Sequence, residues 1–128
     1  MFRSELNLTA DPEPDFWLLG RPLIWSDSVY GTIMAPSGFR TDLASIPRVV
    51  RNLPFLDVDG QSRRPAVLHD YLYSSRTGFR LGRDFADRFL YTALLAEGTT
   101  KATAWAFWAG VRMGGSSHWD PLTARQYA

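Results

Sequence analysis

An imidazole and a carboxylate stand side by side at His69 and Asp70, in a segment that otherwise has the pattern of a buried amphipathic helix. Burying either group is costly unless a partner compensates it, so the fold must supply one. Asp87 is the best candidate, because it lies among apolar residues of the next predicted helix. A carboxylate on one imidazole nitrogen fixes the tautomer of the ring and leaves the other nitrogen available as a base. The residue types therefore point to a His69–Asp87 dyad of the kind that activates water for hydrolysis.

Two predicted helices must position this dyad. One spans about residues 64–75, Gly78 breaks the helical pattern, and the next spans about residues 81–97. The short connection makes the two helices antiparallel neighbours. His69 is nine residues before Gly78 and Asp87 is nine residues after it, so we expect the two side chains at similar heights. The alternative is a buried His–Asp pair that only locks the two helices together, and the spacing alone slightly favours it.

Tyr73 and two further carboxylates extend the candidate site. Tyr73 lies one helical turn after His69 on the same face, whereas Asp70 projects about 100° away around the helix. Asp42 lies in an earlier segment that would bring it beside His69 and Asp70. Such oxygen and nitrogen ligands suit divalent cations, so we predict calcium or zinc at Asp70 and Asp42. The alternative is that Asp42 or Ser45 only caps a short helix over residues 47–52.

Two other groupings of chemical side chains are weaker candidates. Ser45 with His69 would make a nucleophile pair, but no Gly-x-Ser-x-Gly elbow supports it. His118 is followed by a tryptophan and Asp120 in the tail, yet the chain has only two histidines and no His-Glu-x-x-His pattern. We expect this tail to be irregular, with Trp119 folded back onto the core.

The composition bounds the class of protein. The 128 residues predict a single domain, and the absence of cysteine excludes disulfides and cysteine-based metal sites. Of the 14 basic residues only Lys101 is lysine, but the arginines are scattered and form no basic stripe, so we expect no nucleic-acid partner. No segment reaches the roughly 20 apolar residues of a membrane span. Residues 1–5 are too polar for a signal peptide, so we expect synthesis in the cytoplasm.

The pattern along the chain predicts an α+β fold. Residues 4–45 favour a small antiparallel sheet, residues 46–114 favour three or four helices, and residues 115–128 form the tail. The β-favourable runs are 16–19, 23–25, 29–30, 32–34 and 39–43. The last helix begins after Thr99 or Thr100, which can cap it, and its nearly all-round apolar surface predicts burial or packing against a partner.

The motifs GFRTDLASIPR at 38–48 and AVLHDYLY at 66–73, followed by Arg83 and then Ala86-Asp87, resemble a bacterial and phage family catalogued as domain of unknown function 1353. The resemblance covers about residues 15–119. Members are commonly encoded by phages and prophages, which implies synthesis in the host cytoplasm and an association with virions. The resemblance implies no established activity.

The helix pair alone is also similar to phospholipase A2 sites. Those sites place a His-Asp-x-x-Tyr type motif on one helix and an Asp, often followed by Arg, on its antiparallel partner. This chain has HDYLY at 69–73 and ADRF at 86–89. The resemblance implies that His69 activates water, Asp87 orients it and Asp70 helps to bind calcium. The chain departs from the pattern because it has no disulfides and no glycine-rich loop immediately before the helix.

Three functional hypotheses follow. The first is a phage-encoded hydrolase with the His69–Asp87 dyad and a divalent cation, acting on an ester or amide of the cell envelope, in phospholipid or peptidoglycan. The second is a non-enzymatic virion or tail-assembly protein, whose partners are other phage structural proteins and whose His–Asp cluster only holds the fold. The third is an intracellular phage protein that binds a host factor, for which no specific residue argues. The solvent accessibility of His69 and its distance to Asp87 separate the first two.

Overall fold

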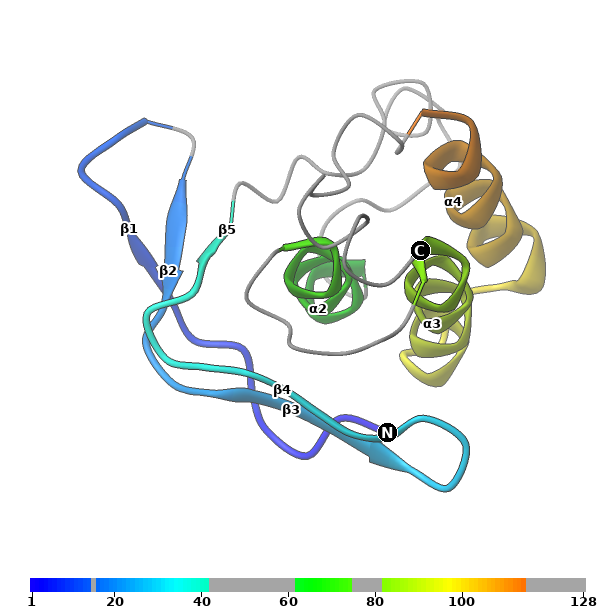
Figure 1. The fold of residues 1–128 in the computed structure, drawn as a ribbon, viewed down its shortest axis with the longest axis horizontal. Helices are drawn as coiled ribbons and strands as arrows, with labels where there is room; N and C mark the ends of the chain where they lie inside the picture. The colour runs from blue at the N-terminus through cyan, green and yellow to red at the C-terminus, as the bar shows by residue number, and fades with distance from the viewer. Residues whose placement is uncertain (15, 42–61, 75–81, 115–128) are drawn as a thin grey trace.

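The protein is described from a computed structural model, over residues 1–14, 16–41, 62–74 and 82–114. Within these residues, short strands are followed by helices, which confirms the predicted α+β fold (Figure 1). The strands are β1 (Leu8–Ala10), β2 (Trp17–Leu19), β3 (Leu23–Asp27), β4 (Gly31–Ala35) and β5 (Arg40–Thr41). The helices are α2 (Arg63–Tyr73), α3 (Arg83–Ala96) and α4 (Lys101–Gly114). The predicted short helix at 47–52 and the tail at 115–128 lie outside the described residues.

The strands make two small antiparallel sheets rather than one. In the described residues one sheet has the order β1-β2-β5 and the other pairs β3 with β4. The run predicted at Val29–Tyr30 is wrong as a strand, because it forms the turn of the β3–β4 hairpin. The side chain of Asp27 accepts the backbone N–H groups of Val29 (3.0 Å) and Tyr30 (2.6 Å), and Gly31 follows with a φ of 70°. This local turn chemistry overrides the β propensity of the two residues.

The helix ends follow from capping. The backbone N–H of Thr103 donates to the side chain of Thr100 (3.1 Å), which confirms Thr100 as the cap of α4. α3 ends where Gly98 takes a φ of 98°, and the N–H of Thr99 then donates to the carbonyl of Leu94 (3.1 Å). α3 therefore stops at the glycine that the sequence indicated, and α4 begins three residues later.

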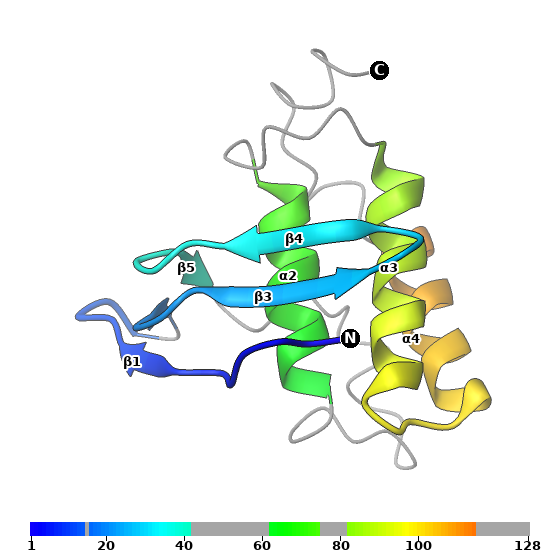
Figure 2. The same ribbon diagram turned by 90° about the horizontal axis from the view of Figure 1, so that it is seen from below.

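The helices stack side by side, with α3 between α2 and α4, and the β3–β4 hairpin crosses over α2 (Figure 2). A first apolar core lies between the strands and helices α2 and α3. Its largest fully buried side chains include Trp25, Phe89 and Leu68. A second core joins the three helices, and its buried members are Ala66, Leu90, Leu94, Ala104, Phe107 and Val111. This packing fixes the relative positions of the three helices that carry the candidate site.

In the described part of the chain, no helix combines the length and the apolar composition needed to cross a bilayer.

Candidate functional site

His69 and Asp87 meet as predicted. The Nε2 atom of His69 on α2 lies 2.8 Å from Oδ1 of Asp87 on α3. Because a carboxylate only accepts hydrogen bonds, Nε2 carries the proton and donates it to Asp87. The pair is deep in the structure, with His69 2% exposed and Asp87 0% exposed. The equal spacing of the two residues from Gly78 was therefore a correct guide to their contact.

Tyr73 joins the same carboxylate oxygen. Its hydroxyl donates to Oδ1 of Asp87 at 2.5 Å, and its ring lies 4.4 Å, centroid to centroid, from the imidazole of His69. The structure therefore brings together the three residues His69, Tyr73 and Asp87. Two residues one helical turn apart on α2 therefore fix a single oxygen of a carboxylate on α3.

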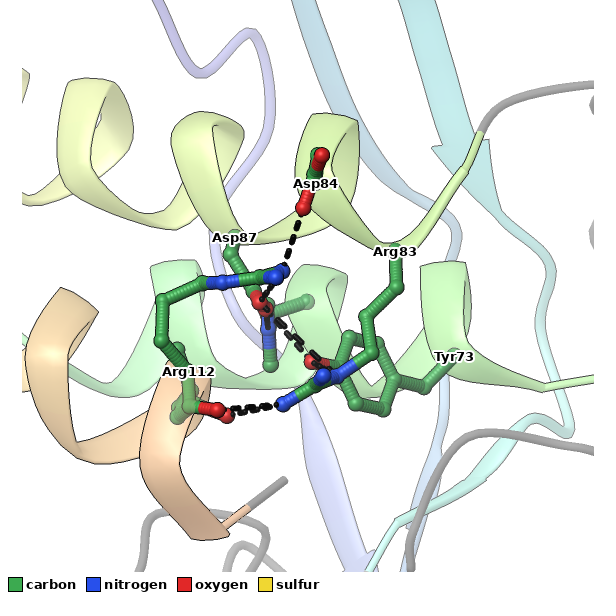
Figure 3. Close-up of polar contacts among 7 residues, drawn as sticks. Tyr73, Arg83, Asp84, Asp87 and Arg112 are labelled. Atoms are coloured by element: carbon green, nitrogen blue, oxygen red, sulfur yellow. Dashed lines mark hydrogen bonds and ion pairs between the residues drawn. The ribbon is translucent and has the colours of Figure 1, made fainter. Parts of the chain in front are cut away.

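Two arginines complete the cluster (Figure 3). Nη1 of Arg112, on α4, lies 2.8 Å from Oδ2 of Asp87 and 2.6 Å from Oδ1 of Asp84. Arg83 donates through Nε to the hydroxyl of Tyr73 (3.1 Å), and its Nε is 4.0 Å from Asp87. We call His69, Tyr73, Arg83, Asp87 and Arg112 the Asp87 cluster. It ties all three helices together through one buried carboxylate.

Arg83 also closes the end of α4. Its Nη2 donates to the backbone carbonyls of Val111 (2.7 Å) and Arg112 (2.9 Å). Carbonyls in the last turn of a helix have no partner within the helix, so this side chain satisfies two groups that need one. Arg83 thereby couples the end of α4 to the hydroxyl of Tyr73 on α2.

The electrostatics keep Asp87 charged. Burial alone would raise the pKa of its carboxyl, but hydrogen bonds from His69, Tyr73 and Arg112 outweigh that effect and the pKa is lowered. Burial raises the pKa of Tyr73, and its hydrogen bond to Asp87 raises it further, so this hydroxyl remains a donor. The pKa of Arg112 is raised because its bond to Asp87 outweighs its desolvation. The cluster therefore holds a fixed carboxylate surrounded by fixed donors.

The second ring nitrogen of His69 decides what the cluster can do chemically. In the neutral imidazole, with Nε2 donating to Asp87, Nδ1 carries a lone pair. Among the described residues, Nδ1 has no hydrogen-bond partner. An imidazole held in this way is arranged as a proton acceptor, provided that water or a substrate reaches Nδ1.

The predicted cation ligands are Asp70 and Asp42. Asp70 is half-buried and has an interaction of its own. Asp42, Ser45 and His118 lie outside the described residues. In residues 1–14, 16–41, 62–74 and 82–114, no three His, Cys, Asp or Glu side chains group closely enough to hold a metal ion. The cation site at Asp70 and Asp42 stays a prediction.

Arg83 and Arg112 are members of the Asp87 cluster that the sequence analysis did not place in the candidate site. Arg83 precedes Asp87 by one helical turn, which is a detectable signal for an ion pair. Arg112 is the basic residue in the last turn of α4, directly after the apolar run 104–111. A charged residue in such a place requires a partner, and that signal could have pointed to the buried carboxylate.

Comparison with known proteins gives one match. Residues 17–111 match the family described as protein of unknown function (DUF1353). No curated protein and no solved structure matches the chain. The matched range includes every residue of the Asp87 cluster except Arg112. Because the match covers most of the sequence, the chain belongs to the DUF1353 family.

Proposed function

We propose that the protein is a hydrolase in which His69 acts as a general base and Asp87 orients it. The observation that carries this proposal is the engagement of one ring nitrogen only: Nε2 is fixed on Asp87 at 2.8 Å, and Nδ1 has no partner among the described residues. In this role Nδ1 takes a proton from water while the water oxygen attacks the carbonyl carbon of an ester or amide. The proton then passes to the leaving group, and His69 returns to its starting state.

Asp87 and Tyr73 act through His69 in this mechanism. The lowered pKa of Asp87 keeps it ionised, so it stabilises the imidazolium that forms when Nδ1 is protonated. Tyr73 is a positioning residue, because its hydroxyl holds the carboxylate oxygen that accepts from His69. Asp70 and Asp42 are the proposed ligands of a divalent cation, which when bound would polarise the carbonyl of the substrate.

The proposed substrate is an ester or amide of a bacterial cell envelope, in phospholipid or in peptidoglycan. The helix pair supports an ester hydrolase, since a His-Asp-x-x-Tyr type motif faces an Asp on the antiparallel helix as in phospholipase A2 sites. The phage setting that the family resemblance implies supports the envelope as the place of action. We propose synthesis in a host cytoplasm and release toward that barrier.

A second candidate function rests on a different observation. His69 is only 2% exposed and Asp87 is fully buried, which favours a cluster that holds the fold and does no chemistry. The protein would then be a non-enzymatic component of a virion or tail. In that case its partners are other phage structural proteins, and they bind at surfaces away from the Asp87 cluster.

The two candidates are separated with a variant that has a single histidine. The chain has two histidines, so His118→Ala leaves His69 as the only imidazole. Diethyl pyrocarbonate modifies accessible neutral imidazoles, and mass spectrometry reports the extent of modification. We expect His69 in the folded variant to react, and activity to fall in step with its modification. Complete protection until the protein unfolds would favour the non-enzymatic candidate.

Activity is measured on defined substrates with a matched variant. Vesicles of phosphatidylglycerol and phosphatidylethanolamine test ester hydrolysis, and isolated peptidoglycan tests amide hydrolysis, each with calcium, with zinc or with a chelator. His69→Gln keeps an N–H that donates to Asp87 but removes the base. We expect this variant to retain its fold, judged by circular dichroism, and to lose activity. Equal activity in His69→Gln and the wild-type protein would refute the role of His69.

A further inference from the structure

A pocket of about 430 Å³ lies apart from the Asp87 cluster. Its walls come from the β3–β4 turn and from the exposed sides of α3 and α4, and its lining residues are Tyr30, Arg88, Tyr91, Thr92, Trp105 and Trp108. We call it the Arg88 pocket. No member of the Asp87 cluster lines it, and its volume falls in the range of small-molecule sites.

The aromatic walls of the Arg88 pocket are held in place by the core. The ring of Tyr30 packs edge-on against Phe85 (5.0 Å) and Phe89 (5.5 Å), and its hydroxyl lies 3.2 Å from Oγ1 of Thr92. Trp105 and Trp108 lie on α4, which the buried Phe107 anchors in the second core. Trp105 is nevertheless 59% exposed, so a ligand can reach its indole. Rings that are fixed before binding lose little entropy when a ligand docks.

The polar groups of the pocket are mainly donors. Arg88 is exposed, and among the described residues its guanidinium has no ion pair or hydrogen bond. The two indole N–H groups, of Trp105 and Trp108, can only donate. The lining includes no carboxylate and no amide side chain. Its hydroxyls, of Tyr30, Tyr91 and Thr92, can donate or accept, and those of Tyr30 and Thr92 are engaged with each other.

We propose that the Arg88 pocket binds a small amphipathic anion, with an apolar or aromatic ring against the indoles and a carboxylate or phosphate on Arg88. An acceptor-only anion matches a donor-rich lining, and an oxyanion pairs in bidentate fashion with a guanidinium. A neutral polyol would bring hydroxyl donors that find few acceptors. A cation would be repelled by Arg88. This site is independent of the proposed hydrolase function, because it uses different residues and a different face of α3.

The test uses probes that share a naphthalene ring and differ in the charge of the group attached to it. The two anionic probes are 2-naphthoate and 2-naphthyl phosphate, which distinguish a carboxylate from a phosphate, and 2-naphthamide is the neutral control. Binding is followed by the indole N–H signals in ¹H–¹⁵N NMR spectra of the full chain. We expect saturable shifts of the Trp105 and Trp108 signals with at least one anion, and binding of that anion at least about tenfold tighter than that of the amide.

Three variants assign the binding to this pocket. Arg88→Gln should weaken binding of the anion about tenfold and leave the amide unchanged, whereas Trp105→Ala should weaken both probes. Arg21→Gln is the matched control, because Arg21 is also exposed but does not line the pocket. All three substitutions are at exposed positions, so we expect each variant to fold, and circular dichroism tests this.

Several results would overturn the proposal. The first is equal affinity for the two anionic probes and the neutral amide. The second is unchanged anion binding in the Arg88→Gln variant. The third is the absence of saturable shifts in the indole N–H signals at millimolar probe concentrations. Sedimentation of the free protein provides a further test. If the protein forms a dimer that Trp105→Ala dissociates, a second copy of the chain occupies this surface and the small-ligand proposal fails.

Discussion

Replacing Asp87 with asparagine tests whether one carboxylate holds the three helices together. Asn has nearly the same size as Asp, so the substitution leaves no cavity, but it removes the negative charge. Donors from His69, Tyr73 and Arg112 all point at the two oxygens of Asp87. The amide of Asn offers one acceptor oxygen and one donor group, so at least one of these donors would face another donor.

The expected loss follows from the burial of the site. Asp87 is fully buried, and removing one partner of a buried ion pair costs about 3–5 kcal/mol because the other charge is left uncompensated. Arg112 keeps part of its compensation through Asp84, so we place Asp87→Asn near the lower end, at about 3 kcal/mol. For a chain of this size that loss lowers the melting temperature by roughly 10 °C. Urea unfolding, extrapolated linearly to water, measures the free energy of unfolding directly.

The same helix offers a matched control in Asp84. Its carboxylate lies 2.6 Å from the guanidinium of Arg112, but its side chain is 74% exposed. Exposed ion pairs contribute about 0–1 kcal/mol, so Asp84→Asn should lower the free energy of unfolding by less than about 1 kcal/mol. If the two variants lose similar amounts of stability, or if Asp87→Asn loses less than about 1 kcal/mol, the central role of Asp87 is refuted.

The pH dependence provides an independent check of the same residue. The pKa of Asp87 is lowered in the folded state, so its contribution is present above the pKa of an unfolded aspartate, about 3.9. That contribution disappears as the pH falls through the lower folded pKa, because the carboxylate is protonated there. The difference in unfolding free energy between the wild-type protein and Asp87→Asn should therefore narrow below about pH 4. A difference that stays constant from pH 7 to acid would contradict the lowered pKa.

Three further substitutions have defined outcomes in the same unfolding assay. Tyr73→Phe removes a hydroxyl that donates to Asp87 and accepts from Arg83, and we expect a loss of about 1–2 kcal/mol; no loss would mean that this hydroxyl is dispensable. Phe107→Ala empties a fully buried position in the second core and should cost about 3–5 kcal/mol, so a cost below 1 kcal/mol would show that α4 packs differently. Gly31→Ala places a side chain at a φ of 70° and should cost about 1 kcal/mol, whereas a gain in stability would contradict that turn.

The contact between His69 and Asp87 could be predicted because it depends on local rules. Helical periodicity placed each residue on the inner face of its own helix, and the short connection around Gly78 made the helices antiparallel. Once both helices are fixed, equal spacing from the connection brings the two residues to the same height. The structure confirms this with a distance of 2.8 Å between Nε2 and Oδ1.

The arginines could not be placed by the same rules. Arg112 comes 25 residues after Asp87 and reaches it from α4, so its contact depends on how α4 packs against α3. That packing is set by the second core, to which α2, α3 and α4 all contribute. A long arginine side chain also has many carboxylates within reach, and spacing in the sequence does not select among them. The contact between Arg112 and Asp87 therefore depends on the packing of the complete fold.

Strand pairing was the other feature that the sequence left open. The runs on either side of residues 20–22 have the pattern of a hairpin, yet β2 pairs with β1 and β5 while β3 pairs with β4. The β2–β5 pairing joins Trp17 to Thr41, which are far apart in the sequence. Local turn signals predict where a strand ends, but they do not predict which edge it pairs with. The division into two sheets follows from these non-local contacts.

The two candidate functions make different demands on one atom of His69. Both need Asp87 as a buried acceptor and both need Tyr73 to hold it, so substitutions at these two positions lower stability under either hypothesis. Only the hydrolase needs a lone pair on Nδ1. His69→Gln retains a donor for Oδ1 of Asp87 and removes that lone pair. A folded His69→Gln protein without activity, beside an active wild-type protein, is therefore explained by catalysis and not by the support that His69 gives to the fold.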